Sequence, residues 1–226
     1  MTVTPDRLLR AAGIAAATAG AVFVAVQIKH PTLDITTVAT TEMSVRSTAK
    51  AIMTVLALAG IAGMYLRQVR QIGVLGLVGW LLFSLGYLAM FGVEVVAGVV
   101  LPSLVDTAPG YVQDVLTAAL GGTPTGDIGA MQILLTFSAV GYMGGGLLFG
   151  IALFRAGVLA RWAAALLAVG AVSTLALSAL PESFNRPVAV PVGIALIGLG
   201  VSLWRDQRRP VATAPAEVPA GQPAVR

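Results

Sequence analysis

The chain has 226 residues, of which 57% are hydrophobic and only 11% are charged. About a quarter of the residues of a soluble domain are charged, so this composition excludes an ordinary cytosolic enzyme, a disordered regulator and a nucleic-acid-binding protein. With no Cys and one His, the chain offers no internal disulfide, thiolate or iron–sulfur centre, or His-cluster metal site. We therefore expect no metal and no other cofactor.

Six apolar runs are long enough to cross a bilayer as helices, which takes about 20 residues. They cover about residues 11–28, 51–66, 72–100, 128–154, 162–180 and 187–204. None shows the alternation of a membrane strand. The sequence therefore predicts an all-α, polytopic transmembrane helix bundle with six spans in residues 1–206. Residues 207–226 are rich in Pro and Ala and predict a disordered cytoplasmic tail.

The positive charges predict the orientation of these spans, because positively charged loops stay in the cytoplasm. Most Lys and Arg residues fall at alternate ends of the runs: Arg7, Arg10, Arg67, Arg70, Arg155, Arg161, Arg205, Arg208 and Arg209. Both termini are therefore predicted to be cytoplasmic, and Trp162 and Trp204 fall at the inner interface. The bias toward Ala, Gly, Val and Arg is typical of GC-rich bacterial genomes, so we expect a multi-pass protein of a bacterial plasma membrane.

The first run also has the features of a signal peptide. Arg7 and Arg10 precede the apolar stretch, and Ala19-Gly20-Ala21 has the small residues of a cleavage site. Cleavage there would leave five spans in the same orientation, and this alternative stays open.

One loop segment carries a helical pattern outside the spans. In residues 112–120 the apolar side chains recur at helical spacing, whereas Gln113, Asp114 and Thr117 face the other way. The segment follows Ala108-Pro109-Gly110 and ends at Gly121-Gly122. We therefore predict an amphipathic helix on the outer membrane surface or over the bundle.

The third run holds the main candidate site. Glu94 is the only acid inside a predicted span, and buried membrane charges are functional candidates by default. Trp80, Ser84, Tyr87 and Phe91 precede it at steps of three and four, so the five residues share one helix face. This face is either the wall of an outward-opening cavity, or a helix-packing seam across which Ser84 and Tyr87 form hydrogen bonds.

The fourth run supplies the opposite surface. Asp127 caps its outer start, and Gln132 and Thr136 lie one turn apart on one face. The candidate ligand-binding residues are therefore Trp80, Ser84, Tyr87, Phe91, Glu94, Asp127 and Gln132.

Four glycines further along this run suggest close helix packing. Gly141, Gly145, Gly146 and Gly150 give two overlapping GxxxG spacings, which let another helix approach closely. We expect tight packing, with dimerisation as the alternative.

The remaining polar residues near the outer side have ordinary explanations. His30 is expected to be a solvated loop residue, and Arg46 and Lys50 to be interfacial anchors. The alternative for Arg46 and Lys50 is a shared outer site with Glu94 and Asp127.

The end of the fourth run carries a family resemblance. Residues 144–155 (GGGLLFGIALFR) and 157–162 (GVLARW) resemble a family of bacterial integral membrane proteins known only as a domain of unknown function. The opening RAAG at residues 10–13 also fits, whereas Ala160 stands where the family pattern has Pro. The resemblance implies a multi-span membrane architecture and no catalytic or ligand residues.

Three functions are compatible with these features. The first is a binding or transport module for a small hydrophobic or amphiphilic ligand, with a cavity between spans three and four under the 112–120 helix. The second is an accessory subunit that binds a protein partner. The third is a membrane enzyme using Glu94 and Asp127, although no nucleophile, zinc-protease or nucleotide-binding motif occurs. The bilayer itself is a partner in all three.

Overall fold

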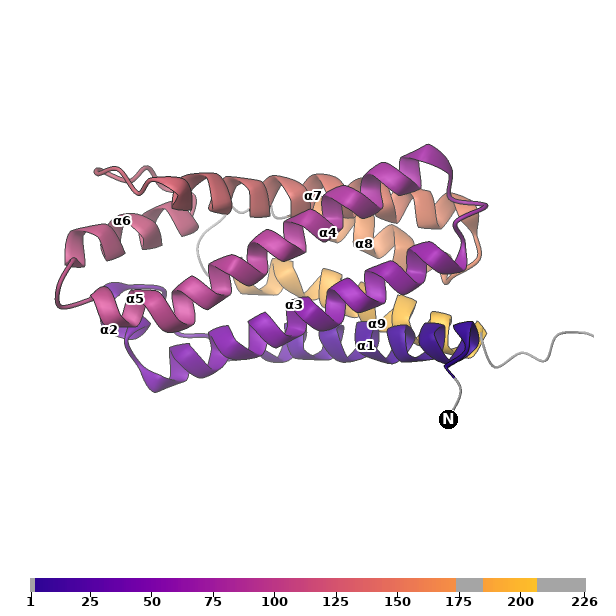
Figure 1. Cartoon of the computed structure of the whole chain (residues 1–226), viewed down its shortest axis with the longest axis horizontal. Helices are drawn as coiled ribbons and strands as arrows, with labels where there is room; N and C mark the ends of the chain where they lie inside the picture. Colours follow the sequence, from indigo (N-terminus) through magenta and orange to yellow (C-terminus); the bar gives the residue numbers. More distant parts are fainter. Residues whose placement is uncertain (1–2, 174–184, 207–226) are drawn as a thin grey trace, which may run out of the picture.

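The computed structural model describes residues 3–173 and 185–206, and the helices form an elongated bundle (Figure 1). In the described part of the chain all regular secondary structure is helical. The helices are α1 (Pro5–Ala25), α2 (Ile35–Val38), α3 (Thr41–Arg67), α4 (Gly73–Val95), the π-helix η1 (Val96–Val100), α5 (Leu101–Leu104), α6 (Pro109–Ala119), α7 (Ala130–Ala156), α8 (Arg161–Ser173) and α9 (Asn185–Asp206).

The described helices fit a multi-pass membrane protein. Five helical stretches are long and apolar enough to cross a membrane: Pro5–Ala25, Thr41–Arg67, Gly73–Leu104, Ala130–Ala156 and Ala189–Asp206. The third joins α4, η1 and α5, and the last is part of α9. Helix α8 is apolar but has only 13 residues. The rest of the predicted fifth span, residues 174–180, lies outside the described residues, as does the predicted tail at 207–226. The sixth span therefore stays a prediction.

Helix α8 and the five longer helices close into a ring. Each packs against two neighbours, in the order α1, α3, α4, α7, α8, α9 and back to α1. The interior of this ring is apolar, and Ile61, Phe83, Tyr87, Phe149 and Leu196 are fully buried in it. The ring brings the first and last helices of the described chain side by side.

The two ends of the bundle differ in charge. At one end lie the N-terminus, the α3–α4 and α7–α8 connections and the end of α9 (Figure 1). We call it the basic end, because its charges include Arg7, Arg10, Arg67, Arg70, Arg155, Arg161 and Arg205. The opposite end holds α2, α5 and α6. We call it the acidic end, because its loops and helix ends include Asp34, Glu42, Glu94, Asp106, Asp114 and Asp127.

The glycines of α7 serve packing inside the chain. A Cβ on Gly141 would lie 2.8 Å from the Cα of Gly86 in α4, and one on Gly150 would lie 2.7 Å from a backbone nitrogen of α8. Gly145 faces α4 and Gly146 faces α8 in the same way. Backbones this close gain dispersion contacts that larger residues would prevent. The four glycines predicted for helix packing therefore hold α7 between its two neighbours.

A second close contact, between α1 and α9, was not predicted. A Cβ on Gly13 would lie 2.8 Å from the carbonyl oxygen of Gly200, and one on Gly20 would lie even closer to the carbonyl oxygen of Gly193. Ala16 and Ala19, on the same side of α1, are fully buried. The contact joins segments more than 170 residues apart, which a pattern within one helix does not reveal.

The polar outer loop is more helical than the sequence suggested. Helix α3 begins at Thr41, ten residues before the predicted apolar run, because Thr40 caps it and Glu42 lies in its first turn. The short α2 precedes it, capped by Asp34 and Thr37 in a reciprocal capping box. Hydropathy marks only the apolar part of such a helix, so its polar turns were missed.

The third predicted span changes geometry near its end. Residues Val96–Val100 form a π-helix, and the N–H of Leu101 bonds to the carbonyl of Val96. Pro102 follows directly, and a proline ring clashes with the carbonyl four residues before it, here that of Gly98. The wider π turn accommodates this clash, and it sets Val96 and Val100 on the side facing α7.

The amphipathic helix predicted at 112–120 is observed as α6. Val112, Val115 and Leu116 are buried in a second apolar core with Val38, Leu101 and Ile128. Gly121, with φ +83°, ends the helix in the left-handed region. Leu120 was expected on the apolar face but is 55% exposed, because the helix ends before it.

Candidate functional site

Glu94 forms an ion pair between two helices. Its Oε1 lies 3.4 Å from Nζ of Lys50 in α3, and the two side chains are only 13% and 19% exposed. A buried membrane carboxylate needs such a partner, because an isolated charge is costly in the bilayer. For Lys50, the pair supports a shared site with Glu94 over the role of an interfacial anchor. The pair also joins α3 to the last turn of α4, just before η1.

The other residues of the predicted face contact different neighbours. Trp80 stacks on Tyr65 of α3, with ring centroids 4.6 Å apart and planes 12° apart. Tyr87 is fully buried and lies edge-on to Phe83, at 4.9 Å. Ser84 and Phe91 are half-buried. The structure thus distributes this face over helix contacts on both sides of α4, as a packing seam would.

Two tyrosine hydroxyls lie inside the seam. The rings of Tyr87 in α4 and Tyr142 in α7 are 5.9 Å apart. Both hydroxyl oxygens are buried without a hydrogen-bond partner in the described part of the chain. The bonds predicted across the seam from Tyr87 are therefore not seen. Sequence reasoning did not single out Tyr142, although it follows Gly141 at the contact with α4.

The apolar space between the third and fourth predicted spans lies on a different face. A groove of about 660 Å³ opens between η1, α5, α6 and the start of α7. It is lined by Val96, Val100, Leu104, Tyr111, Ala130, Met131, Ile133, Leu134 and Phe137. We call it the α6 groove. All its lining side chains are apolar except for the hydroxyl of Tyr111, so it suits an apolar chain more than a polar solute.

Glu94 points away from the α6 groove. Gly92 faces Leu134, which lines the groove. Successive helix residues turn by about 100°, so Glu94 lies about 200° around α4 from Gly92. That rotation matches its pair with Lys50 on α3. The predicted acidic mouth and the observed groove are thus on opposite sides of α4.

The candidate residues of the fourth span also lie outside the groove lining. Gln132 and Thr136 are exposed and share a face as predicted, with Nε2 of Gln132 donating to Oγ1 of Thr136 at 3.4 Å. Their face is roughly opposite to that of Ala130, Leu134 and Phe137 on the same helix. Asp127 is exposed, and its Oδ1 accepts the N–H of Gly129 at 2.7 Å. Asp127 thus stabilises the turn before α7. The predicted cap was wrong, because the helix begins at Ala130 with Gly129 as its N-cap and no side-chain cap bond.

Asp114 holds α6 against the loop that leads to α7. Its Oδ1 accepts the N–H of Thr125 at 2.8 Å and its hydroxyl at 2.9 Å, and its Oδ2 accepts the N–H of Gly126 at 3.0 Å. These bonds, chiefly the two from Thr125, hold the pKa of the Asp114 carboxyl below its ordinary value. Sequence reasoning placed Asp114 on the polar side of the helix but could not foresee this contact.

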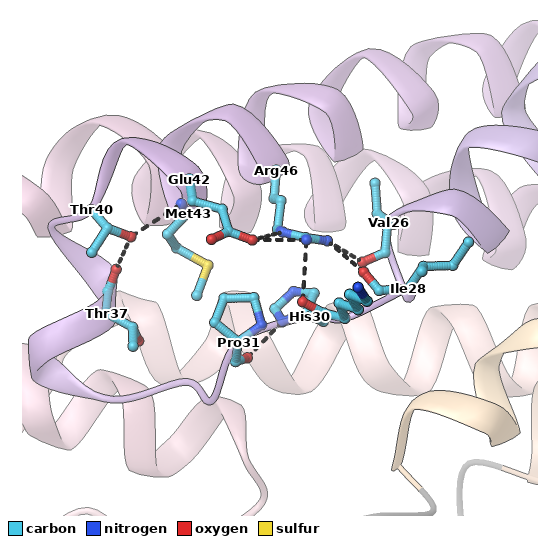
Figure 2. A network of polar contacts seen from close by, with 10 residues as sticks. Val26, Ile28, His30, Pro31, Thr37, Thr40, Glu42, Met43 and Arg46 are labelled. Carbon is cyan, nitrogen blue, oxygen red and sulfur yellow. Dashed lines mark hydrogen bonds and ion pairs between the residues drawn. The ribbon is translucent and has the colours of Figure 1, made fainter.

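Arg46 binds the C-cap of α1 and the turn that follows it at the acidic end. Its guanidinium donates to the carbonyl oxygens of Val26 and Ile28, at 3.0 and 3.2 Å, and of Lys29, at 3.2 Å (Figure 2). Glu42 accepts from the same guanidinium at 2.8 Å. The carbonyls at a helix end lack partners within the helix, so Arg46 caps α1 across space. This is a more specific role than an interfacial anchor.

The described carboxylates do not assemble a recognisable catalytic group. Glu94 faces α3, Asp127 bonds to the turn before α7, and Nδ1 of His30 lies 2.8 Å from the carbonyl oxygen of Pro31. Among the described residues no three His, Asp or Glu side chains gather as metal ligands would.

Comparison with protein-family models, with curated protein sequences and with solved structures finds no match to this chain. The resemblance to a family of uncharacterised bacterial membrane proteins therefore stays a prediction.

Proposed function

We propose that the chain is a six-span protein of a bacterial plasma membrane, with both termini in the cytoplasm, and that it binds the apolar chain of a lipid or small amphiphile in the α6 groove. The observation that carries the proposal is the groove itself. Its volume of about 660 Å³ lies within the usual range of ligand sites, about 300–1,000 Å³, and its lining is apolar.

The position of the groove supports an amphiphilic ligand. Val100 and Phe137, which line it, are 40% and 46% exposed, so the groove opens sideways toward the surrounding lipid. Tyr111, 36% exposed, adds a hydroxyl at the first turn of α6. An apolar chain would enter from the bilayer, and its polar end would remain near Tyr111 and the interface.

Binding is favoured over transport by the filled centre of the bundle. Phe83, Tyr87, Tyr142 and Phe149 pack against one another between α4 and α7. The accessory-subunit alternative rests on the glycines of the fourth span and on the predicted tail at 207–226. The glycines face α4 and α8 of the same chain, and the tail lies outside the described residues. No observation in the described structure favours an enzyme.

A photoreactive fatty acid carrying a diazirine on its chain tests the proposal in native membranes. Irradiation followed by peptide mapping should place the crosslinks in residues 96–104 and 130–137. Equal labelling of all lipid-facing helices, including the exposed positions Val74 and Val169 outside the groove, would contradict it.

Single cysteines test the topology, since the chain has no Cys of its own. Thr36→Cys, Gln113→Cys and Phe184→Cys should react with a membrane-impermeant maleimide from outside intact cells. Gln71→Cys should react only after the membrane is opened. Protection of Phe184→Cys would contradict the six-span topology. Reversed labelling at all positions would show that the orientation is the opposite of the proposed one.

We propose that the first span is kept in the mature protein, because α1 packs closely against its neighbours. Gly13 and Gly20 fit against α9, and Ala16 faces Gly60 of α3. Cleavage after Ala21 would break the helix that closes the ring, so a full-length mature protein is expected by mass spectrometry.

A further inference from the structure

A second groove opens at the basic end, away from the α6 groove. It lies between the start of α8 and the last turns of α9 and has a volume of about 430 Å³. Ile194, Ile197 and Val201, spaced along α9, form its apolar part together with Trp162. The ring of Trp162 covers Gly198, where a Cβ would come within 2.5 Å of the indole. We call it the α8–α9 groove.

The opposite end of this groove is polar and positively charged. Arg205 follows Val201 by one helical turn, so it continues the same face of α9, and it is exposed. Asp206 also lines the groove, but its carboxylate is paired with the guanidinium of Arg67. Among the described residues that line the groove, Arg205 therefore carries the positive charge that can attract an anion.

Two further groups beside Arg205 suit an anionic oxygen. Oγ of Ser202 accepts the N–H of Ala160 at 3.0 Å, so its own proton is left to donate elsewhere. Helix α8 starts at this place, and the positive end of its dipole adds to the attraction for an anion. Charge, hydroxyl donor and helix end thus converge on one end of an apolar groove.

The dimensions match one leaflet of a bilayer. Ile194 and Arg205 are eleven residues apart on one helix, or about 16 Å at 1.5 Å per residue, which is half of the roughly 30 Å hydrocarbon core. Trp162 is 59% exposed at the level where aromatic residues line membrane interfaces. A headgroup at Arg205 would therefore place its chain along Ile197 and Ile194.

We propose that the α8–α9 groove binds an anionic phospholipid from the leaflet at the basic end. The phosphate lies against Arg205 and the hydroxyl of Ser202, and one acyl chain follows α9 beside Trp162. This site is independent of the α6 groove, which lies at the other end of the bundle and carries no comparable charge in its lining.

Native mass spectrometry of the purified protein tests this with equal amounts of phosphatidylglycerol and phosphatidylcholine. One arginine near an anionic lipid surface contributes about 1 kcal/mol, so roughly a fivefold preference for phosphatidylglycerol is expected. Arg205→Gln should bring the two lipids to parity. Arg70→Gln removes an exposed arginine at the same end but outside the groove, and it should keep the preference. Equal losses in both variants would overturn the proposal.

Tryptophan quenching locates the lipid. In a Trp80→Phe/Trp204→Phe background, brominated phosphatidylglycerol should quench Trp162 more strongly than brominated phosphatidylcholine, and Arg205→Gln should remove the difference. Added inorganic phosphate should not restore the emission. Equal quenching by both lipids, or recovery in phosphate, would show that the groove selects no phospholipid.

Discussion

Lys50 of α3 and Glu94 of α4 form an ion pair, with Nζ and Oε1 3.4 Å apart, where α4 gives way to the π-helix η1. The pair lies on one side of α4 and the α6 groove on the other. It therefore fixes the helix that forms one wall of the groove without entering the groove itself.

Glu94→Gln should destabilise the protein, because it leaves the Lys50 ammonium in a site that is 81% covered without its counter-charge. We expect a loss of about 1–3 kcal/mol, below the cost of breaking a fully buried pair because both side chains keep some solvent contact. Thermal unfolding in detergent measures it. The double variant Lys50→Met/Glu94→Gln should recover most of the loss. If the single and double variants unfold alike, the pair has no structural role.

Gly141→Ala should lower the unfolding temperature, because its Cβ would lie 2.8 Å from Gly86 of α4 and would push two helices apart. The matched control is Gly144→Ala on the same helix, where no atom lies within 4 Å of the added Cβ. Alanine should be neutral or slightly stabilising there, since it is the better helix former. Equal effects of the two substitutions would argue against the close α4–α7 contact.

Tyr87→Phe should leave stability unchanged or raise it, because it removes a buried hydroxyl that has no partner among the described residues. Fatty-acid labelling should also be unchanged. Weaker labelling in this variant would instead restore Tyr87 to the ligand-binding wall predicted from the sequence.

Asp114 gives a pH prediction. Its carboxyl has a pKa below the ordinary 3.8, so the stability that it contributes is complete above that value and is lost as the pH falls through the folded pKa. An environment-sensitive dye on Gln113→Cys should keep its emission from pH 8 to about pH 4 and change only below. Asp114→Ala should show the changed emission already at pH 7. A transition near pH 6 in the parent would contradict the assignment.

The fold was predictable where one helix carries its own signal. The apolar run gave the fourth span to within about two residues of α7, whose ends are set by Gly129 and by Gly157 in the left-handed region. The 3.6-residue period gave α6. The start of α3 was missed because its first turns are polar, and η1 because a π turn leaves no mark in hydropathy.

The candidate site was only half predictable, because a pattern on one helix does not say which helices flank it. The spacing correctly placed Trp80, Tyr87 and Glu94 on one face. It could not show that Trp80 and Glu94 contact α3, whereas Tyr87 packs among other aromatic rings. The α6 groove combines residues from four elements. Within one span its sequence signal was the four-residue spacing of Val96, Val100 and Leu104, and such a spacing does not show which residues of α7 face it.

The most direct test of the central claim compares two neighbouring valines. Val100 lines the α6 groove, whereas Val99 is 67% exposed and does not. Val100→Trp should fill the groove and remove most of the fatty-acid crosslinking at residues 130–137, while Val99→Trp should leave it intact. If both variants label like the parent, or both lose labelling equally, the α6 groove is not the binding site.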